Sequence, residues 1–242
     1  MDNAIKLSVI FPVLNSHEIV RRQTLYFQKM NLPDDVEILF IDDGSDPPVD
    51  SPYVAYRTND TRPWTWALAR NQGVRIAKGR NLLLSDLDYI IPKKVIEFGM
   101  EFEGDYMPFK REFGILDENG DFHQDIDTLV EWGWDINRYE ERGFQLPPHP
   151  NEFIIRRDLF FEMGMYREDL VEKQYPQGED RDWKRKRMKW EKDGKLKIDW
   201  DKRPTLYMFP NGQWCKGKDV DTNPFGLFHN LTRKTPVNPW YK

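Results

Sequence analysis

The clearest pattern in the chain is the segment Leu82-Leu83-Leu84-Ser85-Asp86-Leu87-Asp88-Tyr89-Ile90-Ile91-Pro92, where two carboxylates interrupt an apolar run. An apolar run of this length that is closed by proline is typical of a buried strand. Side chains at positions i and i+2 of a strand leave the same face, about 6–7 Å apart. We therefore expect Asp86 and Asp88 to project together where the strand leaves the core.

This pair of aspartates has two interpretations. Buried carboxylates without partners are costly, so such a pair needs cations, hydrogen-bond donors or water. A divalent metal that carries a phosphorylated ligand would meet the need, because hard cations bind carboxylate oxygens and still leave room for phosphate. The alternative is a strand-end turn with solvated aspartates, which is the commoner situation for an isolated Asp-x-Asp.

Length and composition limit the possible functions. The 242 residues are enough for one large domain or two tightly joined halves. The net charge of −5 gives no general case for binding nucleic acid or membranes. The single cysteine, Cys215, excludes an internal disulfide and fits a reducing compartment. The apolar run 7–14 is too short for a signal sequence or a membrane span, so we expect a cytoplasmic protein.

The first half of the chain alternates strand-like and helix-like segments. Strands are predicted at 7–13, 36–41 and 81–87, and helices at 16–30 and 66–77. This order predicts an α/β fold with a Rossmann-like, mostly parallel sheet and right-handed crossovers. Ligands of such sheets bind beyond the carboxyl ends of the strands. The pairs Asp42/Asp43 and Asp86/Asp88 both fall at those ends.

The second half is less regular, with strands predicted at 152–156 and 205–209 and a helix at 178–191. That helix opens with Gly178-Glu179-Asp180-Arg181-Asp182-Trp183. Early acids and later bases complement the helix dipole, by about 0.3–1 kcal/mol each, which explains the pattern without a function. The functional interpretation is that Asp180 or Glu179 accepts a proton from a substrate hydroxyl.

The basic run 181–192 within the same helix also has two interpretations. Such runs are usually solvated helix faces, and the alternative is a patch for phosphate or nucleic acid. Trp183 and Trp190 lie seven residues apart, which suits core packing better than base stacking.

The histidines carry little spacing information. A lone histidine such as His229 is usually structural or on the surface. With a two-carboxylate site elsewhere in the chain it becomes a candidate third metal ligand, since imidazole suits Mn²⁺ better than Mg²⁺. His17, His123 and His149 show no ligand spacing. The sequence contains no P-loop, Gly-x-Ser-x-Gly or CxxC motif.

Taken together, these residues resemble glycosyltransferases of the GT-A fold. The N-terminal half is similar to family-2 glycosyltransferases in Leu7-Ser8-Val9-Ile10-Phe11-Pro12-Val13-Leu14-Asn15, in Ile41-Asp42-Asp43-Gly44-Ser45, in Ala69-Arg70-Asn71-Gln72-Gly73, and in the DxD segment Ser85-Asp86-Leu87-Asp88. The C-terminal half resembles galactosyltransferases from Asn151 to Gly178-Glu179-Asp180 and on to His229. One departure is Tyr175-Pro176-Gln177, which replaces a frequent Trp-Gly-Trp and leaves the sugar preference open.

The resemblance implies a role for each of these positions in a single GT-A domain over 1–242. About 1–100 would bind the nucleotide-sugar and about 101–242 the acceptor. The donor-binding residues would be Pro12, Val13, Asn15, Asp43, Arg70 and Asp86. Asp88 and His229 would hold the divalent metal, Mn²⁺ rather than Mg²⁺, with Asp180 as catalytic base and Glu179 as an acceptor-binding carboxylate.

The expected reaction is metal-dependent, inverting transfer of a hexosyl or pentosyl group from a nucleotide-sugar, with a UDP-sugar favoured, to a hydroxyl of a glycan or another acceptor. Trp132, Trp134 and Trp214 are available to stack on a sugar, although core packing is the commoner role.

Three other functions remain open at this point. A sugar-1-phosphate nucleotidyltransferase would need a glycine-rich N-terminal loop with arginine, and residues 11–16 do not provide one. A non-catalytic carbohydrate- or protein-binding module on the same scaffold is a second alternative. A transferase that acts on a nucleic-acid acceptor is possible but not favoured.

Overall fold

The computed structural model describes residues 4–60, 62, 65–141, 143, 146–172 and 178–210 of the chain. The predictions for Trp214, Cys215, His229 and 175–177 lie outside the described residues.

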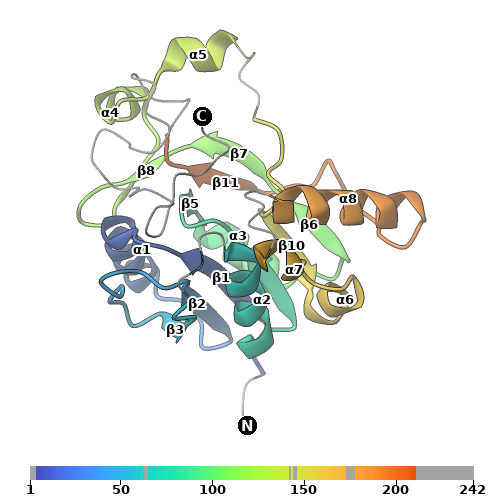
Figure 1. Ribbon diagram of the computed structural model, residues 1–242. Helices are drawn as coiled ribbons and strands as arrows, with labels where there is room; N and C mark the ends of the chain where they lie inside the picture. The colour runs from blue at the N-terminus through green and yellow to red at the C-terminus, as the bar shows by residue number, and fades with distance from the viewer. Residues whose placement is uncertain are drawn as a thin grey trace.

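Six strands form the main sheet, in the order β3-β2-β1-β4-β10-β6 (Figure 1). They are β1 (Leu7–Val13), β2 (Val36–Asp42), β3 (Val54–Arg57), β4 (Asn81–Leu84), β6 (Tyr106–Pro108) and β10 (Phe153–Arg156). β1 pairs in parallel with β2 and β4, and β2 pairs in parallel with β3, whereas β10 is antiparallel to β4 and β6. The predicted α/β fold with a mostly parallel sheet is therefore confirmed.

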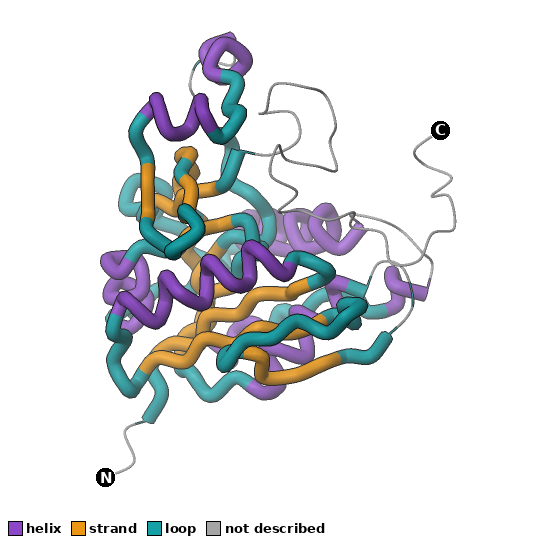
Figure 2. The backbone as a smooth tube through the Cα atoms, turned by 90° about the vertical axis from the view of Figure 1, so that its left-hand side faces the viewer, coloured by secondary structure: helices purple, strands orange, loops and turns teal. Residues whose placement is uncertain are grey.

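Helices cover both faces of this sheet (Figure 2). Alternate residues of β1 point to opposite sides, so Val9 and Phe11 belong to one apolar cluster and Ile10 to the other. The first cluster includes residues of α1 (His17–Met30) and α3 (Lys93–Met100), and the second includes residues of α2 (Trp66–Ile76), α6 (Arg157–Glu162) and α8 (Gly178–Lys192). Because the parallel strands are buried on both faces of the sheet, their sequences are continuous apolar runs.

A smaller sheet lies beyond the carboxyl end of β4, above the main sheet in Figure 1. Its strands are β5 (Tyr89–Ile90), β11 (Thr205–Met208) and β7 (Lys110–Phe113). The remaining elements are β8 (Ile115–Leu116), β9 (Phe122–His123), α4 (Ile126–Glu131), α5 (Ile136–Glu141) and α7 (Asp169–Glu172). Trp132 and Trp134 pack in the core at 4% and 5% exposure, so neither is available to stack on a sugar.

The strand predicted at 81–87 is shorter than expected, because β4 ends at Leu84. The Ser85 amide still donates to the Ile10 carbonyl, but the Asp86 amide donates to the carboxylate of Glu152, at 2.8 Å. The Tyr89 amide then donates to the Asp86 carbonyl, which closes a turn. Asp86 and Asp88 therefore do not project from one face of a strand, and that expectation is wrong.

No helix among the described residues is long and apolar enough to span a membrane.

Candidate active site

The loops after β1 and β2 hold each other in place. Asn15 has a positive φ of 49°, a conformation that asparagine tolerates better than most residues. Its amide donates to Ser45 Oγ at 2.9 Å, and its side-chain oxygen accepts from the Asp46 amide at 2.8 Å. Pro12 and Val13 precede it in β1, with Pro12 partly exposed and Val13 buried. Three of the predicted donor-binding residues thus lie at the carboxyl end of β1.

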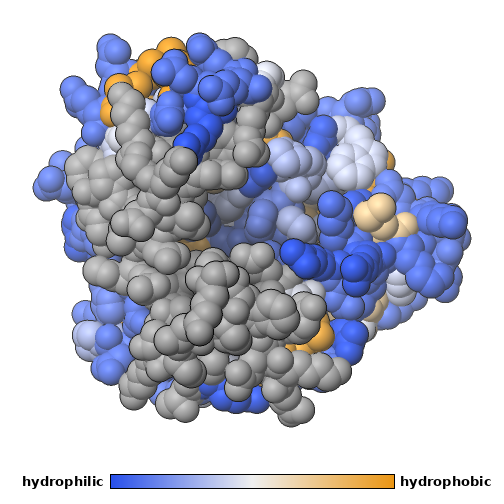
Figure 3. Space-filling model, turned by 45° about the horizontal axis from the view of Figure 1, so that its top comes forward, coloured by the Kyte–Doolittle hydropathy of each residue, from blue (hydrophilic) through white to orange (hydrophobic). Residues whose placement is uncertain are grey.

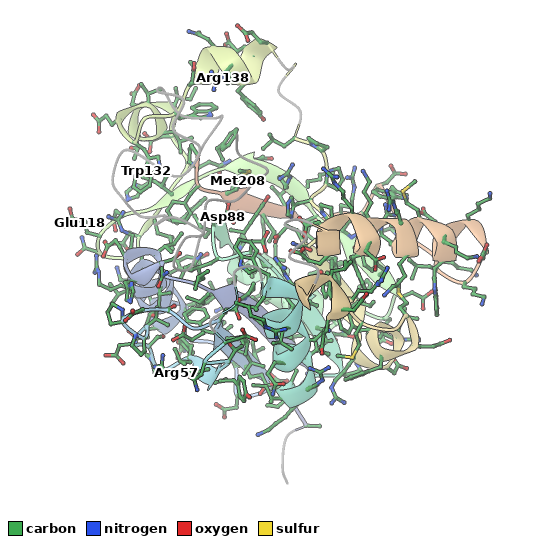
Figure 4. All side chains as sticks on the ribbon, in the orientation of Figure 1. Arg57, Asp88, Glu118, Trp132, Arg138 and Met208 are labelled. Atoms are coloured by element: carbon green, nitrogen blue, oxygen red, sulfur yellow. The ribbon has the colours of Figure 1, made fainter. Side chains whose placement is uncertain are left out.

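The two aspartates at the end of β2 have different surroundings, although both are 1% exposed. Asp42 pairs with Arg57 and accepts from the amide of Ser45 at 2.8 Å, so it organises the loop after β2 (Figure 4). The carboxylate of Asp43 accepts from the hydroxyls of Thr58 and Thr65, at 3.1 and 2.7 Å. Asp42 is therefore a structural residue, and the role of Asp43 with a nucleotide stays a prediction.

Arg70 on α2 lies at the centre of the site and is 1% exposed. Its guanidinium donates to Asp86, and its second terminal nitrogen is 3.6 Å from the Glu179 carboxylate. The rings of Trp66 and Tyr166 lie 5.7 and 5.6 Å from the guanidinium carbon. This environment keeps a buried cation next to two carboxylates that come from different parts of the chain.

Asn71, the next residue of α2, fixes the helix to a distant segment. Its side-chain nitrogen donates to the Tyr166 carbonyl at 2.8 Å, and its oxygen accepts from the Tyr166 amide at 3.0 Å. The Ala69–Gly73 segment therefore combines a helix anchor with the arginine of the site.

Glu179 and Asp180 enter the site from the first turn of α8. Asp180 accepts from the side chain of Asn151 at 2.6 Å, and the Tyr166 hydroxyl donates to the same asparagine at 3.0 Å. Burial raises the pKa of Glu179 to about 7, although Arg70 acts in the opposite direction. Burial likewise raises the pKa of Asp180, with Arg70 again opposing. Both carboxylates are thus better proton acceptors than exposed ones.

Glu152 adds a further carboxylate, which the sequence did not assign to the site. It is fully buried, and it accepts from the Ser85 hydroxyl at 2.5 Å as well as from the Asp86 amide. Burial and the neighbouring Asp86 raise the pKa of Glu152 well above its usual range. For Asp86 itself, burial would raise the pKa, but Arg70 and His149 bring it below its ordinary value.

One group of side chains among the described residues has the composition of a metal site. Ligand atoms of Asp86, His149 and Glu152 all lie within 4.8 Å of one another. The ring nitrogen Nδ1 of His149 is 3.5 Å from Asp86 and 3.8 Å from Glu152. Burial lowers the pKa of His149, which favours the neutral imidazole that binds metals. Two carboxylates and an imidazole suit Mn²⁺.

Asp88, the predicted metal ligand, lies at the junction with the smaller sheet (Figure 4). Its carbonyl accepts from the amide of Phe209 at 3.0 Å, directly after β11. Asp88 is partly exposed, and it is not one of the three residues of the potential metal cluster. The predicted partner His229 lies outside the described residues, so the metal set of Asp88 and His229 stays a prediction.

One face of the molecule is polar and hollowed. In Figure 3, the described residues on the face turned forward are mainly hydrophilic, and this face is hollowed near its centre. Of the site residues expected from the sequence, the structure brings together Arg70, Asp86, Glu179 and Asp180. Beside them it places His149, Asn151, Glu152 and Tyr166. The one sequence signal for Glu152 was a charged residue that opens the apolar segment 153–155.

Comparisons with known proteins agree with this architecture. Residues 8–102 match the sequence model of the family described as Glycosyl transferase family 2. No curated protein matches the chain. The N-terminal part of the chain therefore has the sequence pattern of this family, in the region that contains β1, β2, α2 and the DxD segment.

Several solved structures are similar in fold. The S. aureus TarS structure of residues 1–349 has 18% identity and a TM-score of 0.52, over 85% of this chain and 60% of that chain. A second TarS structure has 16% identity and a TM-score of 0.52, over 84% and 36%. Glucosyl-3-phosphoglycerate synthase from Mycobacterium tuberculosis, in complex with Mn²⁺, UDP and glucosyl-3-phosphoglycerate, has 16% identity and a TM-score of 0.48, over 84% and 70%. This chain thus spans less than two thirds of either TarS structure, and the TarS likeness shows a GT-A fold.

Proposed function

We propose that the chain transfers a sugar from a nucleotide-sugar, with a UDP-sugar favoured, to an acceptor hydroxyl, with inversion at the anomeric carbon. The observation that carries the proposal is the convergence of Asp86, Glu152, Glu179 and Asp180 around the buried Arg70, beyond the carboxyl end of β4. These carboxylates outnumber the cations beside them. A ligand that brings positive charge and hydroxyl groups would fit there, as a metal with a nucleotide-sugar does.

In this proposal, the carboxyl ends of β1 and β2 form the donor pocket. Pro12, Val13 and Asn15 would line it, and Asp43 would bind the base. Arg70 would face the sugar diphosphate, and Asp86 would contact the ribose or the sugar. The side-by-side pairing of β1 with β2 and β4 supports this arrangement, because it brings all three strand ends to one edge. Residues of about 1–100 would thus bind the donor and those of about 101–242 the acceptor.

The proposed metal is Mn²⁺, held by Asp88 and His229. The described residues offer a second donor set of Asp86, His149 and Glu152, whose mixed oxygen and nitrogen ligands fit the same ion. When bound, a divalent cation would offset the negative charge of the diphosphate leaving group. Burial raises the pKa of Glu152, which disfavours its charged form. A cation bound nearby would lower this pKa and favour the ionised carboxylate.

Asp180 would act as the general base. The acceptor oxygen forms a bond to the anomeric carbon, the bond from that carbon to the diphosphate oxygen breaks, and the nucleoside diphosphate leaves with the electron pair. The acceptor proton passes to Asp180, whose carboxylate is oriented by Asn151. Attack opposite the leaving group inverts the anomeric centre, through a transition state that resembles the oxocarbenium ion of glycosidases. Glu179 would bind another acceptor hydroxyl.

The test is a donor panel. The protein is incubated with UDP-, GDP- and dTDP-sugars and Mn²⁺, with and without simple sugar acceptors, and released nucleotide is measured. We expect turnover of one donor class that disappears on chelation of the metal. Donor binding without any turnover would instead support the non-catalytic carbohydrate-binding alternative. Absence of both would contradict a nucleotide-sugar site.

A further inference from the structure

The exposed face of α8 carries a row of cations. Arg181, Lys184, Arg185 and Lys192 are all exposed, and their spacing of three, four and seven residues places them on one face of the helix. We refer to these four residues as the α8 basic strip. Figure 1 shows α8 projecting from the body of the molecule, and the same region of Figure 3 is hydrophilic.

The opposite face of α8 is packed against the protein. Trp183 is fully buried, with its ring 5.3 Å from that of Phe153 in a stacked arrangement. The helix is therefore held firmly on one side, and its basic strip faces solvent on the other.

The acidic residues near α8 form ion pairs with cations outside the strip. Asp182 lies 3.7 Å from Arg167, and Glu191 pairs with Arg187 at 2.9 Å. Asp193 pairs with Lys189 at 2.6 Å. Within the described part of the chain, no carboxylate lies within ion-pair distance of the four strip residues. The strip thus presents its positive charge to solvent.

The helix dipole favours Lys192 in the last turn of α8, but it does not account for the other three residues of the strip. Arg181 lies at the end of the first turn of α8, where the dipole favours acids rather than bases. Arg181 and Arg185 are also like charges at i and i+4, which destabilise a helix by about 0.2–0.5 kcal/mol per pair. A binding role explains the arrangement better.

The position of the strip relates it to the acceptor. Arg181 follows Asp180 directly, so the strip begins at the proposed catalytic base. From Arg181 to Lys192 it runs for about 16 Å along the helix, at about 1.5 Å per residue. A chain that presents its terminal hydroxyl to Asp180 could therefore continue along α8.

We propose that the acceptor is a polyanion with repeating phosphate groups, held by the α8 basic strip. This inference rests on the proposed transferase function, because it concerns the acceptor of the same site. Arginine and lysine are the side chains best suited to phosphate, and arginine can bind it through two hydrogen bonds. An anionic membrane fits the helix less well, because membrane-surface helices need a broad apolar face, and the exposed face of α8 offers Met188 alone. A nucleic acid would use aromatic platforms, but Trp183 points inward.

The test uses inorganic polyphosphate as the probe, with binding measured by calorimetry between 50 and 200 mM salt. Four phosphate contacts predict a fall in affinity of roughly 50-fold over this range. The variant with Arg181→Gln, Lys184→Gln and Arg185→Gln should bind at least about 10-fold more weakly at 50 mM salt, and its remaining salt effect should be roughly threefold. The matched control replaces three exposed lysines outside α8, Lys78, Lys93 and Lys94, by glutamine, and we expect it to bind like the unmodified chain.

Three results would overturn the proposal: no polyphosphate binding at 50 mM salt, equal binding by the strip variant, or tighter binding to duplex DNA or phosphatidylserine vesicles through the same residues. The circular dichroism spectrum of the strip variant should match that of the unmodified chain, which would show that helix content is retained. Because polyphosphate binding needs no turnover, a failed donor panel with intact strip binding would contradict only the transferase function.

Discussion

Arg70 of α2 donates a hydrogen bond to Asp86, which follows β4, and this buried pair joins two elements at the centre of the candidate active site. The same guanidinium lies 3.6 Å from Glu179 of α8. Three segments that are distant in the sequence therefore share one cation.

Arg70→Ala should destabilise the protein by about 3–5 kcal/mol, because it leaves buried carboxylates without their cation. Arg70→Lys should recover only part of the lost free energy of unfolding, since one ammonium cannot replace a planar guanidinium between two carboxylates. Urea denaturation measures the free energy of unfolding of both variants. The control is Arg75→Ala on the same helix, where the pair with Glu168 is about 40% exposed and contributes about 0–1 kcal/mol. Equal losses in Arg70→Ala and Arg75→Ala would refute the central role of Arg70.

Glu179→Gln should change how stability depends on pH. The folded protein holds the Glu179 proton with a pKa of about 7, against 4.5 for the ordinary group. This tighter proton binding stabilises the fold at acidic pH, and the stabilisation is lost as pH rises through about 7. Glutamine does not titrate, so Glu179→Gln does not lose this stability as pH rises. The free energy of unfolding of the variant, relative to that of the unmodified protein, should therefore increase by on the order of 1–3 kcal/mol from pH 5 to pH 8. Urea denaturation at both pH values checks this, with the exposed Glu103→Gln as control. A difference that does not change with pH would be the contrary result.

Asp180→Asn should reduce transfer by about 100-fold or more, the usual contribution of a general base, while donor binding persists. Nucleotide release with acceptor measures the first effect, and calorimetry with the donor measures the second. Asp193→Asn, an exposed change just beyond the far end of the same helix, should leave both unchanged. If Asp180→Asn keeps full transfer activity, another residue is the base.

Two variants decide which residues bind the metal. We expect Asp88→Asn to weaken Mn²⁺ binding at least about 10-fold and His149→Gln to weaken it less, because Asp88 is the proposed ligand. Electron paramagnetic resonance of free Mn²⁺ gives the affinity without requiring turnover. The opposite ranking would assign the metal to Asp86, His149 and Glu152.

Gly73→Ala should destabilise the protein by about 1–3 kcal/mol, although alanine is the better helix former by about 1 kcal/mol. An added Cβ would lie 2.5 Å from Ile10 Cγ2 and 3.0 Å from Ile41 Cγ1, where α2 packs on the sheet. Both isoleucines are buried and β-branched, so they have little room to move. Thermal unfolding tests this, with Gln72→Ala as the neighbouring control. An unchanged or higher melting temperature would show that the contact relaxes.

Much of the main sheet could be predicted from local patterns. The strand predicted at 7–13 is β1, and the helix predicted at 66–77 differs from α2 by one residue. Apolar runs and helical spacing are properties of neighbouring residues, so they can be read from the chain directly. The convergence of Arg70, Asp86 and Asp180 was predictable too, but through resemblance to a family rather than through spacing.

The surroundings of these residues could not be read in the same way. His149, Asn151 and Glu152 reach the site because β10 pairs antiparallel with β4, and no local pattern specifies that partner. The pairing brings the Glu152 carboxylate to the Asp86 amide and so contributes to ending β4 early. The i and i+2 rule for Asp86 and Asp88 failed for this reason.

Local sequence was therefore sufficient for the class of fold and for the strand ends at which ligands bind, because burial on both sheet faces requires apolar runs that end in polar residues. The positions of the two aspartates in the Asp-x-Asp segment depend on contacts between distant parts of the chain. Those contacts place Asp86 with Arg70 and Glu152, and Asp88 beside β11. A buried carboxylate takes its conformation and its pKa from the partners that can compensate its desolvation, and for this chain those partners are remote in sequence.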